Sequence, residues 1–123
     1  IVCIENDPAI LDGMKTLLTS WDARVIAAVE SEAAIEAIEA AGGRVTGLLV
    51  DYHLNRGNGI ATIREIRRKF GETIPAILIT ADRSPHVREA AQIEQVSVLN
   101  KPLKPASLRA LIGQWRNRQI AAE

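Results

Sequence analysis

The sequence predicts an α/β fold in which five short strands alternate with five helices. Two observations support this prediction. Five apolar runs, each short enough to form a buried strand, recur along the chain, and the segments between them carry apolar residues at helical spacing. Strict alternation implies a mostly parallel, doubly wound sheet, and right-handed crossovers favour the strand order 2-1-3-4-5. The expected strands cover residues 1–4, 24–29, 47–50, 76–80 and 96–99.

Local signals mark where several of the helices begin. Asp7 and Pro8 form a typical N-cap and first-turn proline ahead of the first helical segment. Ser31 is expected to cap the second helix, and Pro105 to lie in the first turn of the last. The fourth helix, over residues 84–93, has the weakest apolar spacing. The apolar positions of the other four are Ile10, Leu11, Met14, Leu17, Leu18 and Trp21; Ala34, Ile35, Ile38 and Ala41; Ile60, Ile63, Ile66 and Phe70; and Leu108, Leu111, Ile112 and Trp115.

Length and composition indicate one compact domain. With 123 residues and 47% hydrophobic content, we expect a domain over residues 1–117 and a tail over 118–123. The formal net charge is zero, which gives no electrostatic footprint for direct nucleic-acid binding. A single cysteine, Cys3, excludes an intrachain disulfide and fits a reducing, cytoplasmic compartment. No apolar run is long enough to span a membrane, so we expect no membrane contact by this domain. Cys3 itself is expected to be a buried core residue.

Polar side chains follow four of the five predicted strands. Ligands of doubly wound sheets bind beyond the carboxyl ends of the strands, at the switch point between the first and third strands. A carboxylate that ends a buried run, as Asp51 does after GLLV, is costly to desolvate unless it is at an edge, paired or used. The residues that end or follow the four strands are Glu5, Asn6 and Asp7; Asp51; Thr80; and Asn100 and Lys101. We therefore expect Asp51 to lie in a crevice where these side chains meet.

These residue types suit phosphoryl transfer. Acidic oxygen ligands fit a hard divalent cation, and we expect Mg²⁺ that keeps several waters. A hydroxyl from Thr80 and an ammonium from Lys101 suit the oxygens of a phosphoryl group. A carboxylate between the metal, the hydroxyl and the ammonium can attack phosphorus and become an acyl phosphate. The reaction class that the crevice suggests is phosphoryl transfer onto Asp51.

At this point the sequence resembles the receiver domains of two-component response regulators and hybrid sensor histidine kinases, which have a flavodoxin-like (βα)5 fold. The matching pieces are CIENDPAI, LLVDYHLNRGNG, ILITAD and LNKPLKPASL, in this order and at strand ends. The resemblance implies that Asp51 is the phosphoacceptor, that Thr80 and Lys101 contact the phosphoryl group, and that Mg²⁺ is bound. The implied metal ligands are Glu5, Asn6, Asp51 and the backbone carbonyl of His53. It further implies that Gly59 closes the loop after Asp51 and that the Lys101–Pro102 bond is cis.

The resemblance also implies a partner and a context. The phosphoryl donor would be a histidine kinase or a histidine phosphotransfer domain, which would dock near the first helix at Pro8, Ala9, Ile10 and Met14. The domain itself would be a phosphoacceptor with at most self-dephosphorylation. The chain begins inside an apolar run without a Met, and its last residues read as a fraying tail. We expect the C-terminal receiver of a hybrid histidine kinase, with a separate regulator as the alternative.

Three positions depart from the family pattern. Asn6 stands where the second acid of the metal-binding pair is usual, so we expect weaker Mg²⁺ binding than in a two-acid site. Val98 stands three residues before Lys101, where an aromatic residue is common, so the usual ring rotation on phosphorylation is not available. Asn55 stands where proline is common in the loop after Asp51.

Other functions and roles remain open from the sequence. A degenerate pseudo-receiver, which binds proteins without phosphorylation, is the main alternative; an aspartyl-phosphate hydrolase is less favoured because His53 takes the place of its second acid. His53 and His86 are expected to be exposed, since neither has a partner at metal-ligand spacing. The basic segment over residues 64–70 is expected to be a solvated helix face. Trp21 and Trp115 fit either packing on the sheet or a partner contact.

Overall fold

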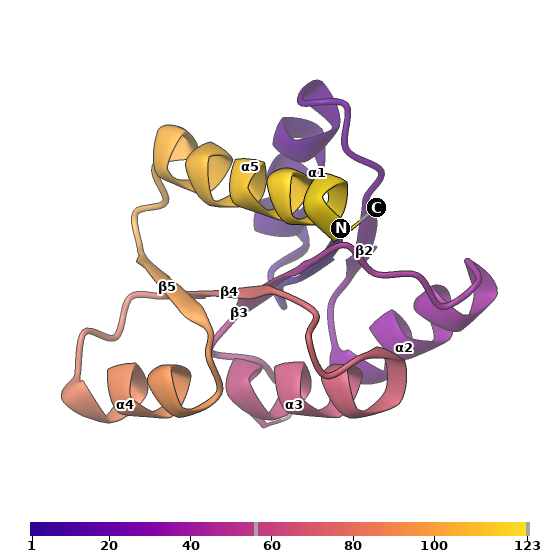
Figure 1. Ribbon diagram of the computed structural model, residues 1–123. Coiled ribbons are helices and arrows are strands. Elements are labelled where there is room, and N and C mark those ends of the chain that lie inside the picture. The colour runs from indigo at the N-terminus through magenta and orange to yellow at the C-terminus, as the bar shows by residue number, and fades with distance from the viewer. Residues whose placement is uncertain (56, 123) are drawn as a thin grey trace.

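The computed structural model describes residues 1–55 and 57–122, with side chains described as far as Trp115. It confirms the predicted α/β fold: a five-stranded parallel sheet of order β2-β1-β3-β4-β5, with helices on both faces (Figure 1). In chain order the elements are β1 (Val2–Ile4), α1 (Pro8–Ser20), β2 (Ile26–Ala28), α2 (Ser31–Ala40), β3 (Leu48–Asp51), α3 (Gly59–Phe70), β4 (Ala76–Thr80), α4 (Pro85–Ile93), β5 (Ser97–Asn100) and α5 (Pro105–Ala122).

The sheet separates two apolar layers. Helices α1 and α5 cover one face, and α2, α3 and α4 cover the other (Figure 1). Successive strand residues point to opposite faces, so Ile4 and Val50 pack against α2 and α3 whereas Cys3 and Leu49 pack against α1 and α5. All these strand side chains are buried, as expected for a parallel sheet between two helix layers. Because the strands are parallel, their carboxyl ends meet at one edge of the sheet.

Several element boundaries differ from the sequence predictions, and those of β2, α2 and α5 are the informative ones. Strand β2 is shorter than the apolar run over residues 24–29. The N-cap of α2 is Glu30, whose backbone is extended, and Ser31 is the first helical residue; its hydroxyl lies 2.9 Å from the Glu65 carboxylate of α3 and does not cap the helix. Helix α5 continues to Ala122 and includes residues 118–122, for which the sequence predicts a tail.

The prediction of a solvated basic face on α3 is wrong for Arg67. Arg64, Arg68 and Lys69 are exposed, but Arg67 is buried. Its guanidinium donates to the carbonyl of Ile74 at 2.8 Å, and also to the carbonyls of Glu94 and Gln95. A planar guanidinium has enough donors to satisfy several carbonyls at once. Arg67 therefore ties α3 to the end of α4 and to the turn before β4.

Trp115 packs on the sheet, so for this tryptophan the structure favours packing over a partner contact. Its side chain is 6% exposed and lies in the layer formed with α1 and α5. Trp21, at the end of α1, is half-buried, and the Arg109 guanidinium carbon lies 5.7 Å from its ring centroid. No helix in the part of the chain that the structure describes combines the length and apolarity that crossing a bilayer requires.

Gly47, just before β3, is required by the Trp115 ring. A Cβ added at Gly47 would lie 2.4 Å from two ring carbons of Trp115. We expect Gly47→Ala to destabilise the protein by about 2 kcal/mol, because the ring must tilt out of its packed position. A pocket of about 350 Å³ beside Trp115 gives the ring some room and limits the cost. Urea unfolding measures the change; Gly13→Ala, in open space on α1, is the matched control and is expected to be neutral or stabilising.

Candidate functional site

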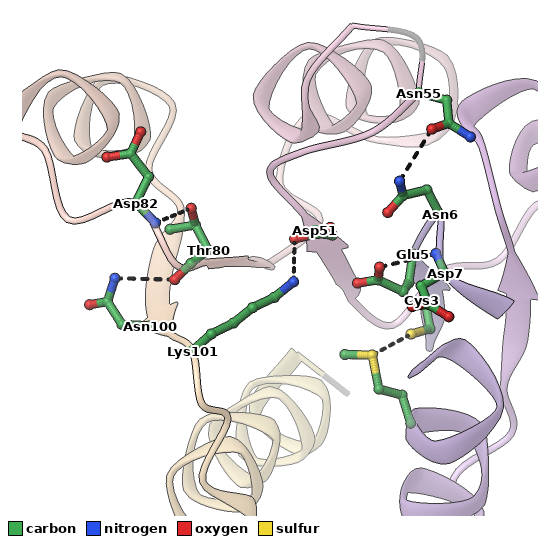
Figure 2. Close-up of polar contacts among 11 residues, drawn as sticks. Cys3, Glu5, Asn6, Asp7, Asp51, Asn55, Thr80, Asp82, Asn100 and Lys101 are labelled. Carbon is green, nitrogen blue, oxygen red and sulfur yellow. Dashed lines mark hydrogen bonds and ion pairs between the residues drawn. The ribbon is translucent and has the colours of Figure 1, made fainter. Parts of the chain in front are cut away.

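Asp51 lies at the carboxyl end of β3, where the sequence placed it. The residue is 3% exposed, and its Oδ1 atom lies 3.3 Å from the Lys101 ammonium nitrogen (Figure 2). Lys101 follows β5, and its side chain reaches back across the edge of the sheet to Asp51. An ammonium beside a buried carboxylate offsets part of the cost of desolvating it. The two residues are therefore brought together as predicted.

Glu5 places a second carboxylate at the same edge. It follows β1, is 2% exposed, and its Oε1 atom accepts from the backbone N–H of Asp7 at 3.2 Å. Burial raises the pKa of Glu5, and the neighbouring Asp51 charge raises it further, whereas the Asp7 N–H and the Lys101 ammonium oppose the shift. The crevice thus holds two buried acids and one ammonium, an excess of negative charge that a cation can neutralise.

Thr80 ends β4 and is fully buried. Its hydroxyl oxygen accepts from the backbone N–H of Asp82 at 2.9 Å, which leaves the hydroxyl hydrogen available to donate. Its carbonyl accepts from the backbone N–H of Lys101 at 2.9 Å and from the Asn100 side chain at 3.3 Å (Figure 2). The three residues that the sequence assigned to phosphoryl contact, Asp51, Thr80 and Lys101, therefore come from three adjacent strand ends.

Two further residues have structural roles that were not predicted from the sequence: Asn100 through its hydrogen bond to the Thr80 carbonyl, and Asp82. The Asp82 carboxylate accepts from the backbone N–H of Ser84 at 2.8 Å, and hydrogen bonds from Ser84 lower its pKa. Asp82 thereby fixes the turn that leads from Thr80 into α4. An Asp two residues before a Ser-Pro pair is a turn signal that could have been found in the sequence.

The residues at the crevice fit a hard cation held by few protein ligands. Glu5 Oε2 and Asp51 Oδ1 are buried and, among the described residues, accept no hydrogen bond. The described chain brings no three His, Cys, Asp or Glu side chains together at metal-binding spacing. Two carboxylates, an amide oxygen and water match the way Mg²⁺ is usually bound, through one or two acids and several waters. Asn6 is half-buried beside Glu5, and its role as a metal ligand stays a prediction.

Other predicted residues have separate outcomes. The His53 side chain is exposed, with its ring at 81° to the Tyr52 ring and a centroid distance of 5.0 Å, and the role of its carbonyl stays a prediction. Asp7 is the N-cap of α1, with its carboxylate 2.9 Å from the Ala9 nitrogen. His86 is exposed, as expected.

Two backbone features of the site are confirmed. The Lys101–Pro102 bond is cis. Gly59 begins α3, and a Cβ there would lie 2.5 Å from the carbonyl oxygen of Asp51. Only a residue without a side chain allows the helix to begin this close to the end of β3.

Three of the four residues predicted to form a docking surface lie at the surface of the protein, and docking itself stays a prediction. Pro8, Ala9 and Ile10 are exposed at the start of α1, beside the crevice. Met14 is not on this surface: it is 8% exposed and its sulfur accepts from the Cys3 thiol at 3.7 Å. The residue lies on the apolar stripe of α1 that faces the sheet, so helical spacing carries it into the core. Burial raises the pKa of Cys3 to about 12, in keeping with a core thiol.

The fold and this crevice define a class of protein: a five-stranded α/β domain with buried acids, a threonine and a lysine at the carboxyl edge of its sheet. The model of the response regulator receiver domain matches residues 1–113 of the chain. The chain therefore belongs to the receiver domain family of two-component signalling. Members of this family interact with histidine kinases or phosphotransfer proteins and typically bind Mg²⁺. A search of curated proteins gave no match.

Solved structures agree on the fold. A CheY-like response regulator receiver domain protein from Methanospirillum hungatei superposes with a TM-score of 0.86 at 20% identity, covering 99% of this chain and 96% of that one. The chemotaxis protein CheY4 of Vibrio cholerae gives 0.82 at 16% identity, with 92% and 94% covered. The receiver domain of the Francisella response regulator 1452 gives 0.82 at 18% identity, with 96% of each chain covered. At these identities the likeness establishes the shared fold.

The raised pKa of Glu5 predicts how stability without metal depends on pH. The folded protein keeps the Glu5 proton at pH values at which the unfolded chain, with an ordinary pKa near 4.5, has lost it. Stability therefore falls as pH rises from about the ordinary value to the raised one, and it stays lower above that range. In EDTA we expect Glu5→Gln to be more stable than the wild type at neutral pH and equal to it in acid. Urea unfolding across pH measures this, with exposed Glu36→Gln as the control; parallel pH profiles for wild type and Glu5→Gln would contradict it.

Proposed function

We propose that the domain accepts a phosphoryl group on Asp51 from a phosphorylated histidine of a partner protein. A carboxylate oxygen of Asp51 attacks phosphorus, the bond from phosphorus to the imidazole nitrogen breaks, and that nitrogen keeps the electron pair. When the other ring nitrogen of the phosphohistidine carries a proton, the products are an acyl phosphate on Asp51 and a neutral histidine. The observation that carries the proposal is the buried Asp51 carboxylate, which has Lys101 3.3 Å away and Thr80 at the next strand end.

Each neighbour has a task in this transfer. The Lys101 ammonium would neutralise charge on the transferring oxygens, and the Thr80 hydroxyl would donate to one of them. Glu5, Asp51, the Asn6 amide oxygen and the His53 carbonyl would hold Mg²⁺, which when bound supplies further positive charge to the phosphoryl oxygens. Burial of Glu5 and Asp51 keeps the acids in a low-dielectric setting, where these charges act more strongly.

The donor would dock beside the crevice, at the exposed start of α1. Ile10 is 45% exposed, and Pro8 and Ala9 are its exposed neighbours. We expect Ile10→Glu to slow transfer from a histidine kinase or phosphotransfer protein by tenfold or more, the approximate effect of losing an apolar anchor. Labelling by acetyl phosphate is expected to be unchanged, because Ile10 does not line the crevice. Equal loss with both donors would contradict this docking site.

The wider context is part of the proposal. We infer that the domain is the receiver of a cytoplasmic phosphorelay, as the C-terminal part of a hybrid histidine kinase or as a separate regulator. One observation favours the competing function of a pseudo-receiver: Asn6 replaces an acid at the metal site. Three residues argue against it, because a domain that is not phosphorylated has no need of them: the buried Asp51, its partner Lys101 and Thr80.

Intact mass spectrometry tests the proposed function. The protein is incubated with acetyl phosphate, with and without Mg²⁺, as wild type, Asp51→Asn and Asp12→Asn. Asp12 is an exposed acid of α1, so its variant controls for the chemical change alone. A Mg²⁺-dependent gain of one phosphoryl group in the wild type and the control, absent from Asp51→Asn, supports the proposal. No gain in the wild type, with a cognate kinase as well as with acetyl phosphate, would leave the pseudo-receiver.

A further inference from the structure

Two residues that depart from the family pattern meet in the structure. Asn6 follows Glu5 at the end of β1, and Asn55 lies in the loop between β3 and α3, 49 residues later. The side-chain amide nitrogen of Asn6 donates to the side-chain oxygen of Asn55 at 3.2 Å (Figure 2). We call this hydrogen bond the asparagine clasp. It joins the end of β1 to the loop that leaves Asp51.

The clasp determines which end of the Asn6 amide faces the crevice. An amide group is planar, and its oxygen and nitrogen leave the same carbon in different directions. Because the Asn6 nitrogen is turned toward Asn55, the Asn6 oxygen lies on the side of the Glu5 carboxylate, as Figure 2 shows. The oxygen is the only atom of this side chain that can bind a cation. In the opposite orientation the NH₂ group would face the acids, donate to them and keep a cation out.

We propose that Asn55 is a positioning residue for the metal site, holding the Asn6 amide with its oxygen toward Glu5 and Asp51. This inference rests on the proposed function, since it concerns the same Mg²⁺ site. An aspartate at position 6 would not need such a partner, because both of its carboxylate oxygens can bind a cation. An asparagine does need one, because its two ends differ in sign. Asn55 therefore prevents the Asn6 amide from turning its NH₂ group toward the two acids.

The orienting role is distinct from a general stiffening of the loop. Partners that orient metal ligands typically affect metal affinity by tenfold or more, and an exposed neutral hydrogen bond is expected to give a smaller effect. A loop-stiffening role would act whatever residue stands at position 6. An orienting role acts only when position 6 is an amide. The two roles can therefore be distinguished by changing Asn55 in proteins that differ in the residue at position 6.

Mg²⁺ titrations followed by backbone amide NMR shifts of residues 5, 6 and 51 test the proposal. We expect Asn55→Ala to raise the Mg²⁺ dissociation constant about fivefold. In an Asn6→Asp background, the further change Asn55→Ala is expected to leave the dissociation constant within twofold of that of Asn6→Asp alone, because either oxygen of a carboxylate can bind the cation. In an Asn6→Ala background it is likewise expected to have no further effect. The Asn6 side-chain NH₂ signals give a metal-free readout and are expected to shift when Asn55 is replaced by alanine.

The outcomes distinguish this inference from the function on which it rests. Unchanged affinity in Asn55→Ala, or an equal loss in the Asn6→Asp background, would overturn the clasp and leave the phosphoacceptor proposal standing. A wild type that shows no Mg²⁺-dependent shift at residues 5, 6 and 51 would overturn the metal site and the clasp with it. Loss of affinity confined to the asparagine background, together with the shifted NH₂ signals, would establish Asn55 as a positioning residue.

Discussion

Replacing Lys101 with methionine is expected to slow phosphorylation of Asp51 by acetyl phosphate at least about a hundredfold, the usual cost of removing one group that stabilises a developing charge. Within the described residues, Lys101 provides the only ion pair to Asp51. Methionine keeps most of the length of the apolar stem while removing the ammonium. Loss of the ammonium leaves the two acids of the crevice without a compensating protein charge. Part of the decrease in the phosphorylation rate is therefore expected to persist at saturating Mg²⁺.

The initial rate of phosphoryl gain, followed by intact mass, measures the effect. Lys104→Met is the matched control, because Lys104 is an exposed lysine three residues further on and makes no described ion pair. The control is expected to react like the wild type. A Lys101→Met rate within threefold of the wild-type rate would show that the ammonium does not take part in the transfer.

Replacing Gly59 with alanine is expected to destabilise the protein by about 3 kcal/mol and to abolish phosphorylation. The added Cβ would lie 2.5 Å from the Asp51 carbonyl oxygen and 2.8 Å from a methyl carbon of Leu78. The first of these atoms is backbone, at the end of the central strand β3, and cannot move aside as a side-chain tip can. The Gly59 nitrogen also donates to the Tyr52 carbonyl at 2.9 Å, so any shift of the helix start moves the loop at the site.

Urea unfolding and phosphoryl labelling of the same preparation measure both effects. Gly113→Ala, in α5, provides the control, since a Cβ there meets nothing within 4 Å. Alanine in that helix is expected to be neutral or stabilising by up to roughly 1 kcal/mol. Normal stability for Gly59→Ala would contradict the steric argument, and normal labelling in a destabilised variant would show that the site tolerates the displaced loop.

The fold and the main residues of the site could be predicted because both depend on strong local patterns. Apolar runs with few polar interruptions specify buried parallel strands, and their alternation with helical spacing leaves few topologies. The parallel sheet then places whatever follows each strand at one edge, so Glu5, Asp51, Thr80 and Lys101 could be grouped from the sequence and are grouped in the structure.

The features that were missed depend on contacts between distant residues. Arg67 lies four residues after Ile63, on the apolar side of α3, but the sequence does not show that the carbonyls after α4 lie within reach of its guanidinium. Ser31 has the right chemistry for a cap, but its hydroxyl lies beside Glu65 on another helix. Met14 fits both a docking surface and a core stripe, and the turn of α1 places it in the core. Asn6 and Asn55 were each noted as unusual, and only the folded chain shows that they touch.

The most direct test of the central claim locates the phosphoryl group within the chain. After reaction with acetyl phosphate and Mg²⁺, borohydride reduction converts an acyl phosphate into a primary alcohol, and trypsin then releases residues 45–56, in which Asp51 is the only acidic side chain. We predict the mass loss of a carboxyl reduced to an alcohol on this peptide, confined to Asp51 by fragmentation and absent without acetyl phosphate. An unreduced peptide 45–56, in protein whose intact mass shows a phosphoryl group, would place that group elsewhere and contradict the assignment of Asp51 as the acceptor.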